Sequence, residues 1–331
     1  MNHLTPIEWD NFLTNFPDSH LLQTSEWGDF KSGYGWKPTR VVSGDSGAQI
    51  LFRKFPLGYT IAYIPKGPVG EVTPNLMEMI ELACEKNNTI VAYIEPDAWE
   101  EEFDPTILVS SGFEQSSISI QPRQTITLSL EGSEEIWLDR MKQKTRYNIR
   151  LAEKKDITIR QSSDIEIFNQ LMKVTGERNE FGIHQEDYYR KVYERFSKRE
   201  MCQLLVAYHQ DKPLAALIMF YKGSRAWYFY GASGNQERNR MPTYLLQFEA
   251  MRTAKEKCCN IYDLWGTPDF PEAYLEENFT SKDDGLWSVY RFKRGFGGMV
   301  KRSAGVFQKV FKPIPFKLYQ LVYQLRKREL A

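Results

Sequence analysis

Residues 201–233 read MCQLLVAYHQDKPLAALIMFYKGSRAWYFYGAS, and this stretch decides the fold. It holds three runs rich in branched and aromatic residues, separated by the short polar turns QDKP and KGSR. Such runs joined by tight turns predict an antiparallel meander of three strands. A helical run, TYLLQFEAMRTAKEKCCN, follows at 243–260, and NIYDLWG at 260–266 indicates one more strand.

Two helices are predicted before this meander, at 164–179 and 186–198, and the first half of the chain has a similar order of elements. The predictions for that half are listed here: helices at 5–15 and 23–31 opened by Thr5-Pro6 and Thr24, strands within 40–65, a helix at 74–88, a strand at 89–96 and two strands within 112–130. This order, used twice, is typical of Gcn5-related N-acetyltransferase (GNAT) units. The expected fold class is α/β (α+β), with two tandem GNAT-like domains whose mixed, mostly antiparallel sheets are flanked by helices.

Composition narrows the class of protein. A chain of 331 residues suggests two domains. The net charge of +0 gives no global attraction for nucleic acid, so a polyanion site would have to be a local patch. Four cysteines, two of them adjacent, and four histidines do not match the spacing of a zinc site, so no metal is expected. Neither a basic segment leading into an apolar run nor a stretch long enough to span a bilayer is visible, so a cytoplasmic protein is expected.

The segment before the helix at 243–260 bears on coenzyme A. GNAT enzymes hold the CoA pyrophosphate with glycine-rich backbone amides at a helix N-terminus. Here the segment reads SGNQERNRMPTYLLQ, without glycine between Arg238 and Tyr244, and Pro242 removes one amide donor. A CoA site is therefore poorly supported, and another acyl donor is expected.

A basic stripe follows from DRMKQKTRYNIRLAEKKDI at 139–157. Lys142, Arg146, Arg150 and Lys154 fall at i, i+4, i+8 and i+12 and would share one side of a helix. The stripe is either a solvated helix surface or a set of contacts to a phosphate backbone.

Six segments in a fixed order resemble the FemABX family, non-ribosomal peptidyltransferases that add amino acids from aminoacyl-tRNA to peptidoglycan precursors. The segments are HLLQTSEWGDFKSGYGWKP (20–38), YIPKGPV (63–69), MKQKTRYNIRLAEKK (141–155), ERNEFGIHQEDYY (177–189), the run from WYFYGAS to DLWG (227–266) and YRFKRGFGG (290–298). The resemblance implies two GNAT-like domains, 1–123 plus 305–331 and 124–304, with the C-terminal segment returning to the first. The heptad-rich insertion of many members is missing, so the chain is similar to the short, FemX-like type.

The resemblance also implies roles for particular residues. Phe292 and Lys293 in YRFKRGFGG match the active-site pair, and Lys293 would steady the oxyanion that forms when an amine attacks an ester; otherwise it lies in a solvated basic turn. The implied substrate-binding residues are Lys31, His184, which stands where other members have an Arg, Tyr188, Tyr228 and Tyr230. We expect the last two to share one face of a strand and line a groove, unless both are core. Glu95 and Asp263 are the candidates for acid or base, and the four residues of the basic stripe become candidates for contact with tRNA.

Three functions are compatible with these features. The first is transfer of Gly, Ala or Ser from aminoacyl-tRNA to the Lys amine of a peptidoglycan stem peptide, carried on lipid II or on UDP-MurNAc-pentapeptide, without a cofactor. The second is acyl-CoA-dependent N-acylation of a cell-envelope polysaccharide, and the third is a non-catalytic precursor-binding module. The basic amphipathic tail, VFQKVFKPIPFKLYQLVYQLRKREL, either packs onto a domain or contacts an anionic membrane at the inner face of the cell membrane.

Overall fold

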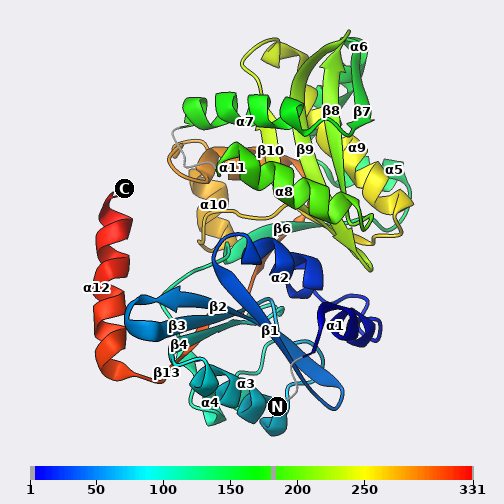
Figure 1. Cartoon of the computed structure of the whole chain (residues 1–331). Coiled ribbons are helices and arrows are strands. Elements are labelled where there is room, and N and C mark those ends of the chain that lie inside the picture. Colours follow the sequence, from blue (N-terminus) through cyan, green and yellow to red (C-terminus); the bar gives the residue numbers. More distant parts are fainter. Residues whose placement is uncertain (1–3, 180–183, 330–331) are drawn as a thin grey trace. The chain divides into compact units, whose positions relative to one another are not determined.

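The computed structural model describes residues 4–179 and 184–329 (Figure 1). The chain forms two compact units, Met1–Ile120 with Ser303–Ala331, and Gln121–Arg302. Each unit is a mixed sheet flanked by helices.

The first unit is built on a six-stranded sheet of order β1-β2-β3-β4-β13-β5. Its elements are α1 (Pro6–Leu13), α2 (Ser25–Ser32), β1 (Trp36–Ser43), β2 (Ser46–Phe55), β3 (Tyr59–Pro65), α3 (Pro74–Lys86), β4 (Thr89–Glu95), α4 (Thr106–Ser110), β5 (Glu114–Gln115), β13 (Phe307–Val310) and α12 (Pro313–Glu329). Among the described strands of this unit, β3 and β4 are the pair that runs in parallel. Strand β13 pairs with both β4 and β5, so the returning C-terminal segment completes this sheet.

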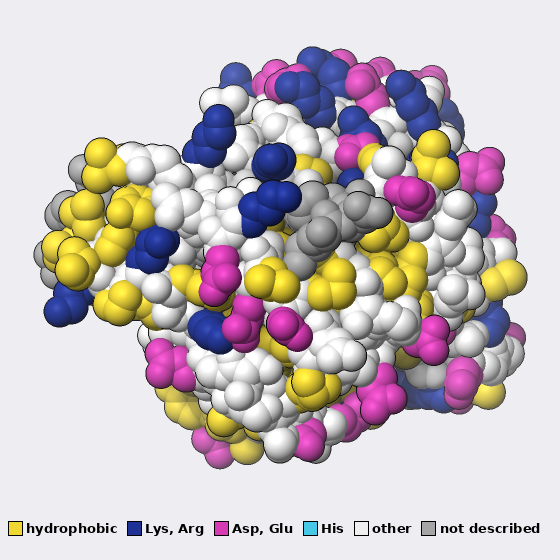
Figure 2. Space-filling view, turned by 60° about the horizontal axis from the view of Figure 1, so that its bottom comes forward, with side chains coloured by type: hydrophobic (Ala, Val, Ile, Leu, Met, Phe, Trp, Pro, Cys, Tyr) yellow, Lys and Arg dark blue, Asp and Glu magenta, His cyan; other side chains and the backbone are white. Residues whose placement is uncertain are grey.

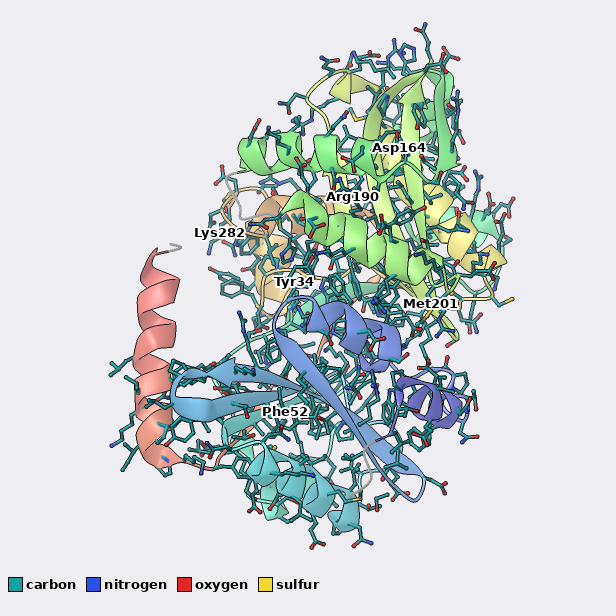
Figure 3. All side chains as sticks on the ribbon, viewed as in Figure 1. Tyr34, Phe52, Asp164, Arg190, Met201 and Lys282 are labelled. Atoms are coloured by element: carbon teal, nitrogen blue, oxygen red, sulfur yellow. The ribbon has the colours of Figure 1, made fainter. Side chains whose placement is uncertain are left out.

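The first two helices begin where the sequence predicts. Thr5 and Glu8 form a capping box at the start of α1, and Thr24 accepts a hydrogen bond from the backbone N–H of Trp27 at the start of α2. Helix α3 packs Leu76, Ile80 and Cys84 into the core with strand residues such as Phe52, labelled in Figure 3. The helical spacing in the sequence therefore identified the buried side of α3.

The second unit has a seven-stranded sheet of order β12-β6-β11-β10-β9-β8-β7. Its elements are β6 (Gln124–Ser129), α5 (Glu134–Arg140), α6 (Gln143–Lys154), β7 (Ile157–Ser162), α7 (Ile165–Asn179), α8 (Glu186–Ser197), β8 (Cys202–His209), β9 (Lys212–Lys222), β10 (Arg225–Ser233), α9 (Pro242–Glu256), β11 (Ile261–Asp263), α10 (Glu272–Asn278), α11 (Trp287–Lys293) and β12 (Met299–Arg302). The meander β8-β9-β10 lies at its centre as predicted, and β10 pairs in parallel with β11.

Helices cover both faces of this sheet. Met219 of β9 belongs to the same buried cluster as Leu246 and Phe248 of α9. The next residue, Phe220, points to the opposite face and meets Phe196 of α8 with ring centroids 5.4 Å apart. Helix α9 thus packs on one face, and α8 with α7 packs on the other.

The segment YRFKRGFGG differs from its expected conformation. Its first half is the end of α11, and Arg294–Phe296 continue as a turn of 3-10 helix, so Lys293 is the last residue of a helix and not part of a turn. Gly297 has a φ of 77°, and a Cβ there would lie 2.0 Å from the carbonyl oxygen of Arg140. The glycine therefore serves close packing against α5. Among the helices of the described residues, none has both the length and the apolar character needed to cross a membrane.

Candidate active site

A cavity of about 910 Å³ lies in the second unit. Its walls come from the end of β10 with the loop that follows, the first turn of α9, the start of α6, helix α11, and the segment after α10. Segments far apart in the sequence thus meet where β10 ends and α9 begins. This is the place where an α/β sheet of this kind commonly binds a ligand.

The cavity is lined by positive charge. The cations among its lining residues are Lys142, Lys144, Arg178, Arg238, Arg291 and Arg294. None of the described residues that line it is an Asp or a Glu. A concave surface with one sign of charge concentrates ligands of the other sign, so the cavity is suited to an anionic group such as a phosphate.

Three of these cations also hold the walls in place. Arg178 donates to the carbonyl oxygens of Ser233 at 2.9 Å and Gly234 at 3.2 Å, which fixes the end of β10. Arg291 donates to the carbonyl oxygens of Phe279 at 2.7 Å and Lys282 at 3.0 Å. These bonds fix the loop between α10 and α11, where Lys282 is labelled in Figure 3.

Arg294 is held by a carboxylate behind the wall. Its guanidinium donates to both carboxylate oxygens of Glu276 and lies 3.8 Å from the ring centroid of Phe279. The Arg294 guanidinium lowers the pKa of Glu276, so this carboxylate stays ionised and neutralises part of the charge of Arg294. The remaining lining cations are Lys142, Lys144 and Arg238, which come from α6 and from the loop before α9.

Aromatic rings form the apolar part of the cavity wall. Tyr244 in the first turn of α9 meets Phe292 of α11 edge to face, with ring centroids 5.1 Å apart, and Phe292 meets Phe296 at 5.2 Å. Tyr228, Phe279, Tyr244 and Phe292 all line the cavity. Flat rings beside cations suit a ligand that carries both phosphates and planar bases.

Tyr228 is held in its position by a glycine. Its hydroxyl lies so near Gly231 that a Cβ on residue 231 would be 1.8 Å from it. Burial raises the pKa of the Tyr228 hydroxyl to about 12, so it is neutral at physiological pH. Gly231 thus provides the space in which Tyr228 forms part of the cavity wall.

Lys293 lies directly behind this wall. Its side chain is only 5% exposed, and its Nζ lies 5.6 Å from the centre of the Tyr228 ring. The amine donates to the carbonyl oxygens of Trp265 and Gly266, the latter at 2.8 Å. Burial lowers its pKa to about 7, against an opposing effect of the Asp263 carboxylate. The alternative of a solvated basic turn is therefore wrong, although Lys293 is not among the residues that line the cavity.

Asp263 lies at the end of β11 and is 7% exposed. Its carboxylate accepts a hydrogen bond from the Thr125 hydroxyl at 2.5 Å and one from the backbone N–H of Trp265 at 2.7 Å. These bonds fix the same backbone turn whose carbonyl oxygens receive Lys293. Asp263 therefore helps to position Lys293. It is not among the residues that line the cavity.

The expectation that Tyr228 and Tyr230 share a face is wrong. Tyr228 pairs with Met219 and Tyr230 with the adjacent residue Ile218, which leaves Phe229 as the extra residue of a β-bulge. A bulge shifts the alternation of side chains by one position. Tyr228 therefore points to the α9 face and the cavity, while Tyr230 points to the α8 face.

On the α8 face, Tyr230 joins His184 and Tyr188. The hydroxyls of Tyr188 and Tyr230 lie 3.3 Å apart, and the His184 ring stacks on Tyr188 at 3.8 Å between centroids. The backbone N–H of His184 donates to the hydroxyl of Tyr189 at 3.2 Å. The structure thus separates the predicted site residues of this unit into two groups on opposite faces of the sheet.

The basic stripe on α6 is only partly at the cavity. Lys142, just before α6, lines it, whereas the guanidinium of Arg146 donates to the carbonyl oxygens of Leu138 and Met141 and closes the end of α5. Arg150 and Lys154 are exposed and do not line the cavity. The stripe therefore does not act as a unit at this site.

In the first unit, Lys31 and Glu95 are linked by intervening side chains. Lys31 on α2 is close enough to Arg53 for the two charges to interact, and Arg53 lies over the ring of Trp36 at 5.6 Å. The Trp36 ring lies 6.3 Å from that of Tyr63, whose hydroxyl donates to Glu95 at 2.5 Å. Burial, and secondarily the charge of Arg53, lowers the pKa of Lys31 to about 8.

Several lining residues were missed at the level of sequence: Lys144, Arg238, Tyr244, Arg291 and Arg294. All five lie in the segments that carry the family resemblance, and Arg291 and Arg294 flank the chosen pair Phe292 and Lys293. The sequence signal for these cations was their clustering in ERNRMP and FKRG. The argument from the basic stripe considered a single helix, so it did not show that these two clusters lie at the same site.

Comparison with known proteins identifies relatives over the whole chain. The sequence pattern of the FemAB family matches residues 4–107, 109–211 and 198–324. A lipid II:glycine glycyltransferase of Staphylococcus aureus (strain COL) is 25% identical over 414 aligned positions, covering 98% of this chain and 96% of the relative. That alignment has more positions than this chain has residues, so the relative contains inserted residues that this chain lacks.

Two solved structures share the fold. The crystal structure of FemX superposes with a TM-score of 0.84 at 23% identity and covers 97% of this chain and 99% of that one. A tandem GNAT protein from the clavulanic acid biosynthesis pathway superposes with a TM-score of 0.51 at 10% identity, covering 93% and 97%. The fold is therefore that of two tandem GNAT-like units, in a chain of the length of FemX.

Proposed function

The chain belongs to the FemAB family, and we propose that it is an aminoacyltransferase of peptidoglycan precursors. It transfers Gly, Ala or Ser from aminoacyl-tRNA to the Lys side-chain amine of a stem peptide and so builds an interpeptide bridge. The acceptor is lipid II, the substrate named for its staphylococcal relatives, or UDP-MurNAc-pentapeptide.

The observation that carries this proposal is the charge of the cavity in the second unit. Among the residues that the structure describes, six cations and no carboxylate line it, beside the aromatic rings of Tyr244 and Phe292. The 3′ end of a tRNA offers phosphates to the cations and bases to the rings. An aminoacyl-tRNA therefore fits this lining better than a neutral acyl donor.

The start of α9 argues against acyl-CoA. Pro242 opens the helix and has no N–H, and the backbone N–H of Tyr244 already donates to the carbonyl oxygen of Met241 at 3.1 Å. Two positions at the start of α9 therefore offer no free amide to the pyrophosphate cradle that acyl-CoA requires. This start of α9 therefore argues against the alternative function, acyl-CoA-dependent N-acylation of a polysaccharide.

The transfer step needs stabilisation of charge more than a nucleophile from the protein. The acceptor amine attacks the carbonyl carbon of the aminoacyl ester, a C–N bond forms, the C–O bond to the ribose breaks, and the amine proton ends on the ribose oxygen. Negative charge grows on the carbonyl oxygen in between, and a fixed cation lowers the energy of that state. Lys293 behind Tyr228 provides this cation in its protonated form, while Asp263 holds the backbone turn to which it is bound.

Each unit has one polar cluster that is a candidate for contacts to the acceptor. Lys31 with Arg53 in the first unit presents two cations for a diphosphate, with Glu95 fixed nearby through Tyr63. In the second unit, His184, Tyr188 and Tyr230 form a separate cluster of rings and hydroxyls that suits polar groups of a substrate.

A transfer assay tests the proposal. Purified protein would receive radiolabelled Gly-, Ala- or Ser-tRNA with lipid II or UDP-MurNAc-pentapeptide, beside matched reactions with labelled acetyl-CoA. Label in the muropeptide from one tRNA establishes the reaction and identifies donor and acceptor together. Label only from acetyl-CoA would replace the proposal with the N-acyltransferase alternative.

A further inference from the structure

Helix α12 exposes an apolar surface beside a basic one. Its inner side packs on the first unit: Phe316 is buried, and Tyr319 meets Phe55 of β2 edge to face at 5.8 Å. On its outer side Ile314, Leu318 and Leu321 are 84%, 51% and 59% exposed. Their spacing of four and three residues places them along one side of the helix. Packing in the first unit therefore accounts for Phe316 and Tyr319 but not for these three exposed side chains.

The tip of the β2–β3 hairpin adds a fourth exposed apolar side chain. Leu57 is 85% exposed and has a φ of 62°, a backbone conformation that favours Gly or Asn over a branched residue. The hairpin contacts α12 through Phe55 and Tyr319, and Lys312 lies 6.0 Å from the ring centre of Tyr59. Nothing in the packing of the first unit accounts for a leucine at this position.

The same two segments carry one sign of charge. Residues 53–70 and 303–328 contain no Asp or Glu. Lys317 is exposed, and Lys312 of the second segment reaches the Tyr59 ring of the first. Figure 2 shows hydrophobic side chains gathered at the left of the view, where α12 lies, with Lys or Arg side chains beside them.

We infer that the outer side of α12 and the adjoining tip of the β2–β3 hairpin form a docking surface for an anionic lipid membrane. We call this surface, made of Leu57, Ile314, Leu318 and Leu321 with Lys312 and Lys317, the α12 surface. The leucines and Ile314 enter the boundary between headgroups and acyl chains, and the lysines meet anionic headgroups.

The combination of charge and exposed apolar groups favours a membrane over other partners. A nucleic acid would satisfy the lysines but offers no apolar layer for four exposed aliphatic side chains. A second copy of this chain would place lysines of both copies against each other, because the segments have no acidic residues to pair with them. A bilayer with anionic lipids satisfies both parts of the surface.

This inference does not depend on the transfer reaction. The α12 surface lies in the first unit, and none of its residues lines the cavity of the second unit. Binding can therefore be measured without turnover, and either result leaves the proposed function to its own assay.

Co-sedimentation with vesicles tests the inference on the full chain. The wild-type protein is mixed with vesicles of phosphatidylglycerol and phosphatidylcholine in equal parts, and with vesicles of phosphatidylcholine alone. The test variant is Leu57→Asn with Leu318→Ser, since Asn suits the left-handed backbone at residue 57. The control is Leu82→Ser, which removes a leucine that is 48% exposed on α3.

We expect the wild type to bind the vesicles with phosphatidylglycerol, and to bind less as salt is raised. The double variant should bind about a hundredfold more weakly, with about tenfold expected from each leucine, and the control should bind like the wild type. Lys317→Glu should also weaken binding.

Three results would overturn the inference. The wild type could fail to bind the anionic vesicles, or the double variant could bind as well as the wild type. The wild type could also sediment as a dimer that the double variant does not form, which would make the α12 surface an interface between copies of the chain.

Discussion

The Nζ of Lys293 lies 5.6 Å from the centre of the Tyr228 ring, so a buried cation stands directly behind a residue of the cavity wall. The amine is fixed by the carbonyl oxygens of Trp265 and Gly266, and the Asp263 carboxylate fixes the backbone N–H of Trp265. This arrangement holds a positive charge at a defined place without exposing it to water.

Replacing Lys293 tests its role in transfer. Lys293→Met keeps the length of the side chain and removes the charge, so we expect kcat to fall by at least about tenfold, because a cation behind the wall acts on the developing oxyanion through space and not as a direct hydrogen-bond donor. The KM for aminoacyl-tRNA should change little, because Lys293 is not among the residues that line the cavity. Steady-state kinetics measure both, and a kcat within a factor of two of the wild type would refute the role.

The same substitution predicts a pH effect on stability. Burial lowers the pKa of Lys293 to about 7 in the folded state from 10.5 as the ordinary value. Between these values the unfolded state binds more protons, so the unfavourable contribution of Lys293 is complete below pH 7 and disappears as the pH rises toward 10.5.

Urea denaturation at pH 6.5 and pH 9 measures this effect. We expect the free energy of unfolding of the wild type to rise with pH relative to that of Lys293→Met, in which the buried amine is missing. Taking the difference between the two proteins removes contributions of other groups such as Lys31. A difference that stays constant between the two pH values would show that Lys293 does not titrate there.

Cations of the cavity should determine the affinity for tRNA. Lys144→Ala removes a lining cation on α6, while Arg150→Ala removes an exposed one on the same helix that does not line the cavity. We expect only Lys144→Ala to raise the KM for aminoacyl-tRNA, and to reduce the slope of its dependence on log salt by about 0.7. Equal effects of both substitutions would favour the original stripe of phosphate contacts on α6.

Because the Tyr228 hydroxyl occupies the space beside Gly231, substitutions at these two residues should have coupled effects on the free energy of unfolding. Gly231→Ala places a Cβ against the Tyr228 hydroxyl, so we expect a loss of about 1–3 kcal/mol in the free energy of unfolding and lower transfer activity. Gly234→Ala is the matched control, because its Cβ would meet its nearest atom at 3.5 Å.

A double-mutant cycle tests the coupling. Combining Gly231→Ala with Tyr228→Ala should recover most of the stability lost through Gly231→Ala, since the clashing ring is gone. Additive losses measured by urea denaturation would mean that the two residues are not in contact.

Lys31 is expected to act on the acceptor only. Lys31→Ala should raise the KM for the precursor about tenfold through loss of a charged contact to its diphosphate, and leave the KM for aminoacyl-tRNA unchanged. Lys37→Ala, an exposed lysine nearby on β1, is the control. A change in the KM for tRNA instead would remove Lys31 from the acceptor site.

Regular features of the fold could be predicted from the sequence because local patterns specify them. The meander β8-β9-β10, the caps at Thr5 and Thr24 and the buried side of α3 follow from alternation, capping chemistry and helical spacing. The bulge at Phe229 could not be read in this way. A single extra residue leaves the composition of a strand unchanged, yet it moves Tyr230 to the other face of the sheet from Tyr228.

The cavity could not be predicted from the sequence, because tertiary structure brings its lining residues together. Lys144, Arg238 and Arg294 are separated by many residues in the sequence. They line one cavity because three segments lie together there: the start of α6, the loop before α9, and the end of α11. Lys293 was chosen from a resemblance, and its burial at the end of a helix could not be read from a segment with three glycines and three cations. Local patterns therefore predicted the elements, and their assembly determined the site.

The most direct test of the central claim is to locate the 3′ end of a bound tRNA. A tRNA with a photoreactive azidoadenosine at its 3′ end would be cross-linked to the protein, and the labelled peptides identified by mass spectrometry. The account predicts labelling in residues 228–247 or 286–296, and its loss when unmodified aminoacyl-tRNA competes. Labelling confined to the first unit, or labelling that acetyl-CoA removes and aminoacyl-tRNA does not, would contradict it.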